Sequence, residues 1–214
     1  MKMRLIRTGV IALGLVARFW TQSLIGQRPV TAGEIGDVVH QWTASGNAAL
    51  HEHPLAANAL LMVSSAIIDA FGIFLLATAI FGASVRPFLG LLLLFGMRQL
   101  CQALCSLPVP PGMIWHNPGI PSLLVTYGVA NDFFFSGHTA IAVYGSLELT
   151  RAFPKQPVRI LAGLVALFEA ATVLVLRAHY TMDVVGGVLA AFCAAMVAAR
   201  FAPRCDRLLE NLGR

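Results

Sequence analysis

Six long apolar stretches are the feature that most constrains the fold of this chain. A helix needs about 20 mostly apolar residues to cross the hydrocarbon layer of a membrane. Stretches of this kind run from Leu5 to Ile25, Leu55 to Phe81, Phe88 to Leu107, Phe133 to Phe153, Val158 to Leu176 and Val184 to Phe201. They fill most of the 214 residues, which leaves no room for a separate soluble domain. The expected fold is all-α: residues 1–214 form a single polytopic membrane bundle of six transmembrane helices.

The composition and the placement of charge agree with a membrane protein. Hydrophobic residues make up 57% of the chain and charged residues 12%, far from the balance of a soluble domain. The net charge of +5 would also suit nucleic acid, but the basic residues follow the positive-inside rule instead. They gather in segments 2–7, 86, 151–159 and 200–214, which alternating spans place on one side. Both termini are therefore expected in the cytoplasm, and no nucleic acid partner is expected.

The opposite face receives the loops around residues 34–53, 108–132 and 177–183. All six histidines fall on or near this outer face, namely His40, His51, His53, His116, His138 and His179. Fold stability does not require the histidines to gather on one face of the membrane. Within the first loop, residues 31–54 are too polar to span, and a short amphipathic helix on the outer surface is expected there.

The first residues resemble a signal peptide, with a basic head and an apolar centre. No convincing small-x-small cleavage site follows and apolar residues resume after Arg18, so we expect an uncleaved first span. The four cysteines form no metal-type CxxC pair and are expected to be core or lipid-facing residues.

Charged residues inside apolar stretches cost about 2.5 to 3.5 kcal/mol each on insertion scales and so need a reason. Arg98, Asp132, Arg177 and Asp183 all approach one layer near the outer membrane surface. For Arg18, Asp69 and Glu169 the favoured interpretation is interhelical hydrogen bonding, and Arg18 could instead reach towards a lipid headgroup.

The outer layer holds the parts of a phosphoryl-transfer site. His179 and Asp183 are four residues apart, so on a helix the carboxylate could hold one imidazole N–H and make the other nitrogen a nucleophile or base. His138 comes from another helix and could supply the complementary proton. The remaining candidates would bind phosphate and stabilise its charge: Arg98, Arg177, Ser136 and the backbone at Gly137.

These motifs identify a family resemblance. "FSGHT" followed by "RAHYTMDVVGG", with "RQLCQALCSLPVP" upstream, is similar to the type-2 phosphatidic acid phosphatase superfamily. Within it, the chain resembles the branch of sphingomyelin synthases and phosphatidylcholine:diacylglycerol cholinephosphotransferases. The similarity covers roughly residues 55–200 and includes the six-span layout.

The resemblance implies a role for each matched residue. His179 would be the nucleophile of a phosphohistidine-type intermediate, Asp183 would orient it, and His138 would protonate the departing alcohol and later deprotonate the acceptor. Arg98 and the run from Leu107 to Pro110 match the first motif of the synthase branch, where the arginine holds phosphate. Asp132 begins the motif that contains Ser136, and the triplet Phe133 to Phe135 would touch lipid. No metal or cofactor is implied.

Three departures from the hydrolase branch favour headgroup transfer. No lysine matches the one before its first arginine, Phe135 replaces a proline, and Arg177 lies only two residues before His179. The expected function is therefore transfer of a phospho-headgroup from a phospholipid to diacylglycerol or ceramide. A lipid phosphate phosphatase would use the same residues with water as the acceptor, and pocket shape decides between them.

Two other classes of protein remain as alternatives. A non-catalytic membrane protein of this fold is disfavoured by the complete set of His138, His179 and Asp183. A serine hydrolase using Ser136 is disfavoured because Ser136 and His138 are two residues apart and point poorly at each other on a helix. Short loops suggest a bacterial inner membrane, with the active site on the extracytoplasmic side. The oligomeric state is not indicated.

Overall fold

A computed structural model describes residues 2–27, 35–127 and 133–213. In these ranges the chain forms helices joined by loops and turns. They are α1 (Lys2–Gly26), α2 (Val38–Trp42), α3 (Ala44–Glu52), α4 (Pro54–Phe81), α5 (Arg86–Leu104), α6 (Gly137–Ala152), α7 (Gln156–Val175) and α8 (Thr181–Gly213). The predicted all-α class is confirmed for the described residues.

Each of the six predicted spans coincides with a helix. Four helices of the described part are long and apolar enough to cross a membrane, namely α4, α5, α7 and α8. Helix α6 has 16 residues, a length of about 24 Å against about 30 Å of hydrocarbon. Helix α1 includes Lys2, Arg4, Arg7 and Arg18. Crossing by these two helices, and the cytoplasmic location of the termini, stay predictions.

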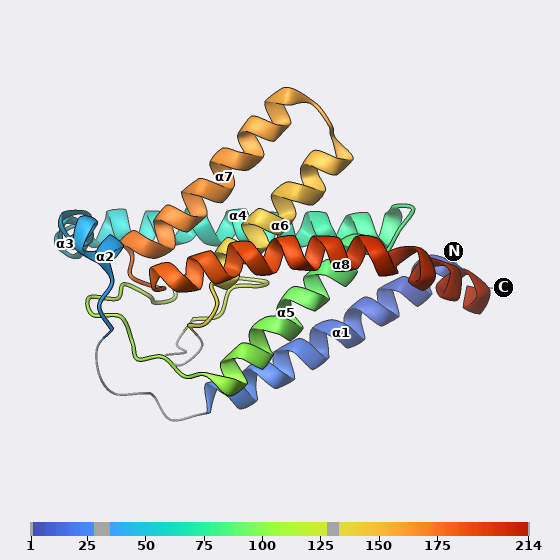
Figure 1. Cartoon of the computed structure of the whole chain (residues 1–214), viewed down its shortest axis with the longest axis horizontal. Coiled ribbons are helices and arrows are strands. Elements are labelled where there is room, and N and C mark those ends of the chain that lie inside the picture. The colour runs from blue at the N-terminus through green and yellow to red at the C-terminus, as the bar shows by residue number, and fades with distance from the viewer. Residues whose placement is uncertain (1, 28–34, 128–132, 214) are drawn as a thin grey trace.

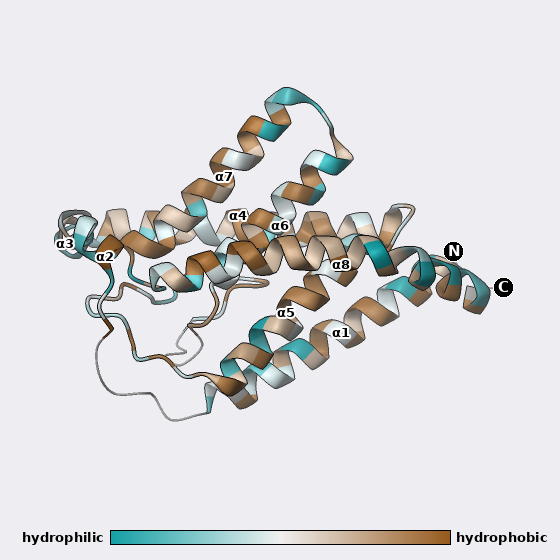
Figure 2. Cartoon of the chain, in the orientation of Figure 1, coloured by the Kyte–Doolittle hydropathy of each residue, from teal (hydrophilic) through white to brown (hydrophobic). Residues whose placement is uncertain are grey.

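The long helices alternate in direction along the chain. Figure 1 shows α1, α5 and α7 running away from the end that holds both termini, and α4, α6 and α8 running back towards it. In Figure 2 apolar residues cover the middle of α4, α7 and α8, whereas hydrophilic residues mark the turn between α6 and α7 and the two chain ends. This distribution suits a bundle whose long helices lie in lipid.

The core lies where α6 and α8 pack against each other and against α5 and α4. It combines large side chains such as Leu75, Leu91 and Tyr144 with small ones on α8 such as Ala191 and Ala194. Small residues let helix backbones approach closely, which is how membrane helices gain van der Waals contact.

Glycine at position 187 brings the start of α8 against the start of α6. A Cβ on Gly187 would lie 2.7 Å from the carbonyl oxygen of Ser136, so only glycine fits this approach. The backbone N–H of Ser136 in turn donates to the carbonyl of Asp183 over 2.9 Å. The two motif segments that were singled out in the sequence are thus joined directly.

The three loops predicted to share the outer face do meet at one end of the bundle. Asn47 donates to the carbonyls of Gly112 (3.1 Å) and Val175 (2.9 Å), and Ile114 N–H donates to Leu176 (2.8 Å). The predicted amphipathic segment forms two helices, α2 and α3, instead of one. They lie at the end of the molecule away from the chain termini (Figure 1).

Candidate active site

A buried cavity of about 40 Å³ lies at this end of the bundle, between α1, α5, α6 and the segment before α8. Its walls include Arg98, Gly137, His138 and His179, which the sequence analysis assigned to the candidate site. They come from the end of α5, the start of α6 and the loop after α7. The structure therefore brings two histidines and a guanidinium from distant parts of the chain to one space.

His179 lies beside Asp183, although the two residues do not share a helix as their spacing predicted. Nδ1 of His179 lies 3.6 Å from Oδ2 of Asp183, within ion-pair reach but too long for a hydrogen bond. Helix α8 begins only at Thr181, so His179 precedes it. The carboxylate also accepts the N–H of Tyr180 over 2.9 Å, which turns the chain so that His179 faces Asp183.

His138 lies in the first turn of α6, which Ser136 caps. Its ring packs edge-on against Trp115, with 5.1 Å between ring centroids. Its Nε2 is buried and has no hydrogen-bond partner among the described residues. An unpaired buried polar atom is costly, so this nitrogen is suited to a group that enters the cavity.

Arg98 is held firmly at the cavity wall. Its Nε donates to the carbonyl of Phe135 over 2.9 Å and its NH1 to Gln22 over 3.4 Å. A Cβ on Gly137 would lie 3.3 Å from that Nε. Glycine at 137 therefore leaves room for the guanidinium beside the start of α6, where backbone N–H groups favour an anion.

Arg18 is a second cavity arginine, which the sequence did not assign to the site. It is only 5% exposed, so it does not extend to a lipid headgroup. Its guanidinium donates to the carbonyl of Leu124 over 3.2 Å and lies over the rings of Phe19 and Phe95. The cost of a charge within the first apolar stretch was the one signal that could have identified it.

Three other predicted ligands of phosphate are placed differently. The Ser136 hydroxyl is fully buried and caps α6 by accepting from Thr139, and it does not line the cavity. Arg177 donates to the carbonyls of Pro111 and His40, each over 3.0 Å, so it joins outer loops. Asp132 lies outside the described residues.

Glu169 makes an interhelical hydrogen bond as predicted, whereas Asp69 bonds a loop instead of a second helix. The Asp69 carboxylate accepts the N–H groups of Leu123 (2.8 Å) and Leu124 (2.9 Å). Glu169 on α7 accepts the hydroxyl of Ser64 on α4 over 2.6 Å. The first fastens a loop to α4, and the second joins two helices.

Helix α2 fastens the segment that carries His179, a contact the sequence did not reveal. Asp37 accepts the N–H (2.6 Å) and the hydroxyl (2.8 Å) of Thr181 while it caps α2 at Val39 and His40. His40 Nε2 lies 2.9 Å from the carbonyl oxygen of His179. Burial acts to raise the pKa of Asp37, but the hydrogen bonds from Thr181 and His40 outweigh it and lower that pKa. At pH values above the usual pKa of an aspartate, the ionised Asp37 carboxylate therefore holds the segment. These hydrogen bonds are lost only as the pH falls through the lowered pKa.

Removing this carboxylate should impair the headgroup transfer expected from the sequence more than it impairs folding. In Asp37→Ala we expect kcat to fall by about tenfold to a hundredfold, because displacement of a reacting group by about 1 Å has effects of that size. Steady-state kinetics and thermal unfolding of the same preparation measure the two effects. Asp206→Ala is the matched control, because Asp206 joins Ser84 and Val85 to α8 at the other end of the bundle. Equal kcat losses in the two variants would contradict a positioning role for Asp37.

Comparison of the chain with known protein families gave one match. The family model AtPDCT1/2 matches residues 36–200, a range that contains Asp37, Arg98, His138, His179 and Asp183. No curated protein and no solved structure matches the chain.

Proposed function

The chain belongs to the AtPDCT1/2 family of phosphatidylcholine:diacylglycerol cholinephosphotransferases, and from this premise we propose that it moves a phosphocholine headgroup between lipid alcohols. The observation that carries the proposal is the meeting of His138, His179 and Arg98 at one buried cavity. Phosphatidylcholine is the proposed donor, and diacylglycerol, or ceramide, is the acceptor.

His179 is the proposed nucleophile. Because its Nδ1 faces Asp183, Nε2 is left to attack the phosphorus of the donor. A P–N bond forms as the P–O bond to diacylglycerol breaks, which leaves phosphocholine on the histidine. Asp183 favours this step by stabilising the positive charge that develops on the imidazole.

His138 is the proposed acid and base. Its otherwise unpartnered Nε2 gives a proton to the departing diacylglycerol oxygen. In the second step the same nitrogen takes the hydroxyl proton of the acceptor, whose oxygen attacks phosphorus while the P–N bond breaks. The two steps return both histidines to their starting protonation states.

Arg98 and Arg18 are the proposed phosphate ligands. Both are buried guanidiniums at the cavity wall, where exclusion of water strengthens their attraction for phosphate oxygens. Their hydrogen bonds to backbone carbonyls hold them in place before the charge on phosphorus increases. Such preorganised donors stabilise the transition state without reorganisation.

A second pocket suits the apolar part of a lipid substrate. It has a volume of about 290 Å³, and its walls include Asp183, Phe134, Tyr180 and Leu107. Phe133 lines the cavity itself, 6.3 Å from His179 between ring centroids. The predicted contact of the aromatic triplet with lipid is proposed to occur at this boundary.

We place the cavity on the extracytoplasmic side of the membrane, because the turn between α6 and α7 and both termini carry the arginines expected inside. A cysteine introduced at His116 should then react with an impermeant thiol reagent added from outside intact cells. Labelling only after the cells are opened would reverse the orientation.

The fate of a labelled headgroup tests the function. Purified protein is placed in vesicles of phosphatidylcholine labelled in its choline, together with diacylglycerol of a distinguishable chain length. We expect label in phosphatidylcholine of the new chain length, and none with His179→Ala. Label in free phosphocholine would instead indicate water as the acceptor, which is the phosphatase-type alternative.

A further inference from the structure

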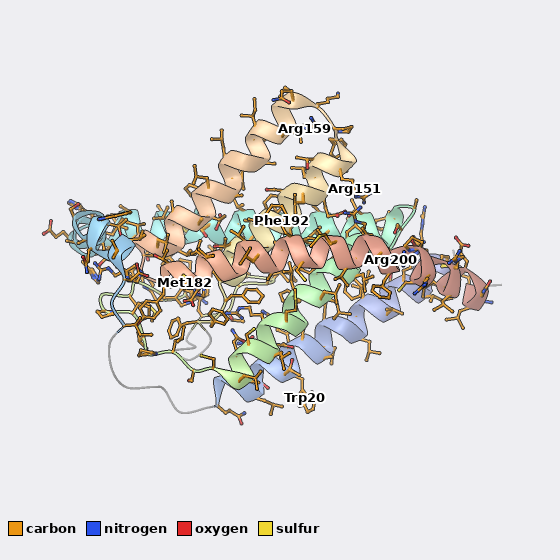
Figure 3. All side chains as sticks on the ribbon, viewed as in Figure 1. Trp20, Arg151, Arg159, Met182, Phe192 and Arg200 are labelled. Carbon is orange, nitrogen blue, oxygen red and sulfur yellow. The ribbon has the colours of Figure 1, made fainter. Side chains whose placement is uncertain are left out.

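A second ligand-binding region lies at the opposite end of the long helices from the cavity. It is an open cleft of about 420 Å³ between the α6–α7 hairpin and α8. The cleft is lined near the beginning of α5, the end of α6 and the beginning of α7, whereas the cavity is lined towards the end of α5, at the beginning of α6 and by the loop after α7. Figure 3 shows Arg151 and Arg159 near the turn of the hairpin and Phe192 on α8.

The floor of the cleft is apolar and exposed. Phe192 and Met196 lie one turn apart on α8 and are 49% and 68% exposed. Leu147 of α6 faces them across the cleft. In a membrane protein an exposed apolar floor of this kind contacts acyl chains, so a lipid molecule is the occupant that the surroundings supply.

The rim of the cleft carries an excess of positive charge. Arg86, Arg151 and Arg159 all line it. Glu148 pairs with two of them, at 3.0 Å from Arg86 and 2.9 Å from Arg151. Three guanidiniums against one carboxylate leave two positive charges beside the apolar floor.

We propose that this cleft binds a phospholipid whose headgroup carries net negative charge. The headgroup phosphate contacts Arg159 and the two paired arginines, and an acyl chain lies along Phe192 and Met196. A zwitterionic lipid would bring its own ammonium group to a rim that is already positive, so it is disfavoured. The site is separate from the transfer cavity, and its occupancy does not depend on the proposed chemistry.

Quenching by brominated lipid tests the site directly. The full chain with Phe192→Trp is placed in nanodiscs in which either brominated phosphatidylglycerol or brominated phosphatidylcholine replaces part of the lipid. The same chain without this substitution gives the background of its three tryptophans. We expect half-maximal quenching of the new tryptophan at a content of anionic lipid that is lower by at least about fivefold, because each of the two unopposed positive charges has an effect of about that size near the surface.

A matched pair of arginine variants separates the cleft from general charge. In the Phe192→Trp background, Arg159→Gln should remove most of the preference. Arg207→Gln, which takes the same charge from an exposed position of α8 outside the cleft, should keep it. Both positions are exposed, so neither substitution disturbs the core. Equal quenching by the two lipids, or equal effects of the two variants, would overturn the proposal.

Discussion

Replacing His179 with alanine is expected to lower headgroup transfer by about 10⁵-fold or more, the effect of removing a nucleophile in an enzyme with a covalent intermediate. The proposed mechanism has no second nucleophile: Ser136 is buried and caps α6, and His138 is the proposed acid and base. Transfer of labelled choline between lipids is the measurement.

The control for this variant is His53→Ala. His53 is exposed at the end of α3. Its substitution makes the same chemical change outside the cavity. It should retain the activity of the parent chain. Activity of His179→Ala within tenfold of the parent would show that the phosphate is not passed through this histidine.

His138→Ala is expected to lower transfer from phosphatidylcholine by about 10²- to 10⁴-fold, the usual contribution of a general acid or base. Diacylglycerol is a poor leaving group, and without His138 its oxygen departs without a proton. Single-turnover kinetics with phosphatidylcholine as the donor measure the loss.

A donor with a better leaving group distinguishes this role from a structural one. p-Nitrophenyl phosphocholine releases an oxyanion that needs no proton, so His138→Ala should release the first equivalent of nitrophenol at close to the parent rate. His179→Ala should not. Equal impairment of His138→Ala with both donors would mean that His138 positions groups and does not transfer protons.

Although α8 continues beyond its apolar stretch to Gly213, the positions of the long helices could be predicted because each one largely overlaps an apolar stretch. The limits of α6 could not. The run from Phe133 to Phe153 is apolar throughout, but Ser136 accepts from Thr139 N–H and starts the helix at Gly137. Apolar composition gives the position of a stretch in the chain, whereas a capping side chain decides where its helix begins.

Within the site, the pairing of His179 with Asp183 was predicted from helical spacing, and the structure places the two together by another route. The N–H of Tyr180 donates to the Asp183 carboxylate and closes a turn at the start of α8. This turn, and not a shared helix, brings the two side chains together. A place at the site was predicted for Arg98 and His138 because polar side chains in apolar stretches are costly, and for Gly137 because glycine lets the backbone approach a ligand. All three residues line the cavity.

The contacts that the sequence did not reveal join residues far apart in the chain. Asp37 and Thr181 are 144 residues apart, and no local pattern links them. Arg18 and Arg177 both occur in or beside apolar stretches of the sequence. In the structure Arg18 lines the cavity, whereas Arg177 donates to backbone carbonyls of the loops. The packing of the helices decides which of these arginines lines the cavity.

The most direct test of the central claim is to trap the headgroup on the protein. His138→Ala should accept phosphocholine from p-nitrophenyl phosphocholine and pass it on slowly, because no base activates the acceptor. After an alkaline quench, which preserves phosphohistidine, mass spectrometry should find one phosphocholine group on the peptide that contains His179. The His138→Ala, His179→Ala double variant should carry none. Nitrophenol release without an adduct, or an adduct on another residue, would contradict transfer through His179.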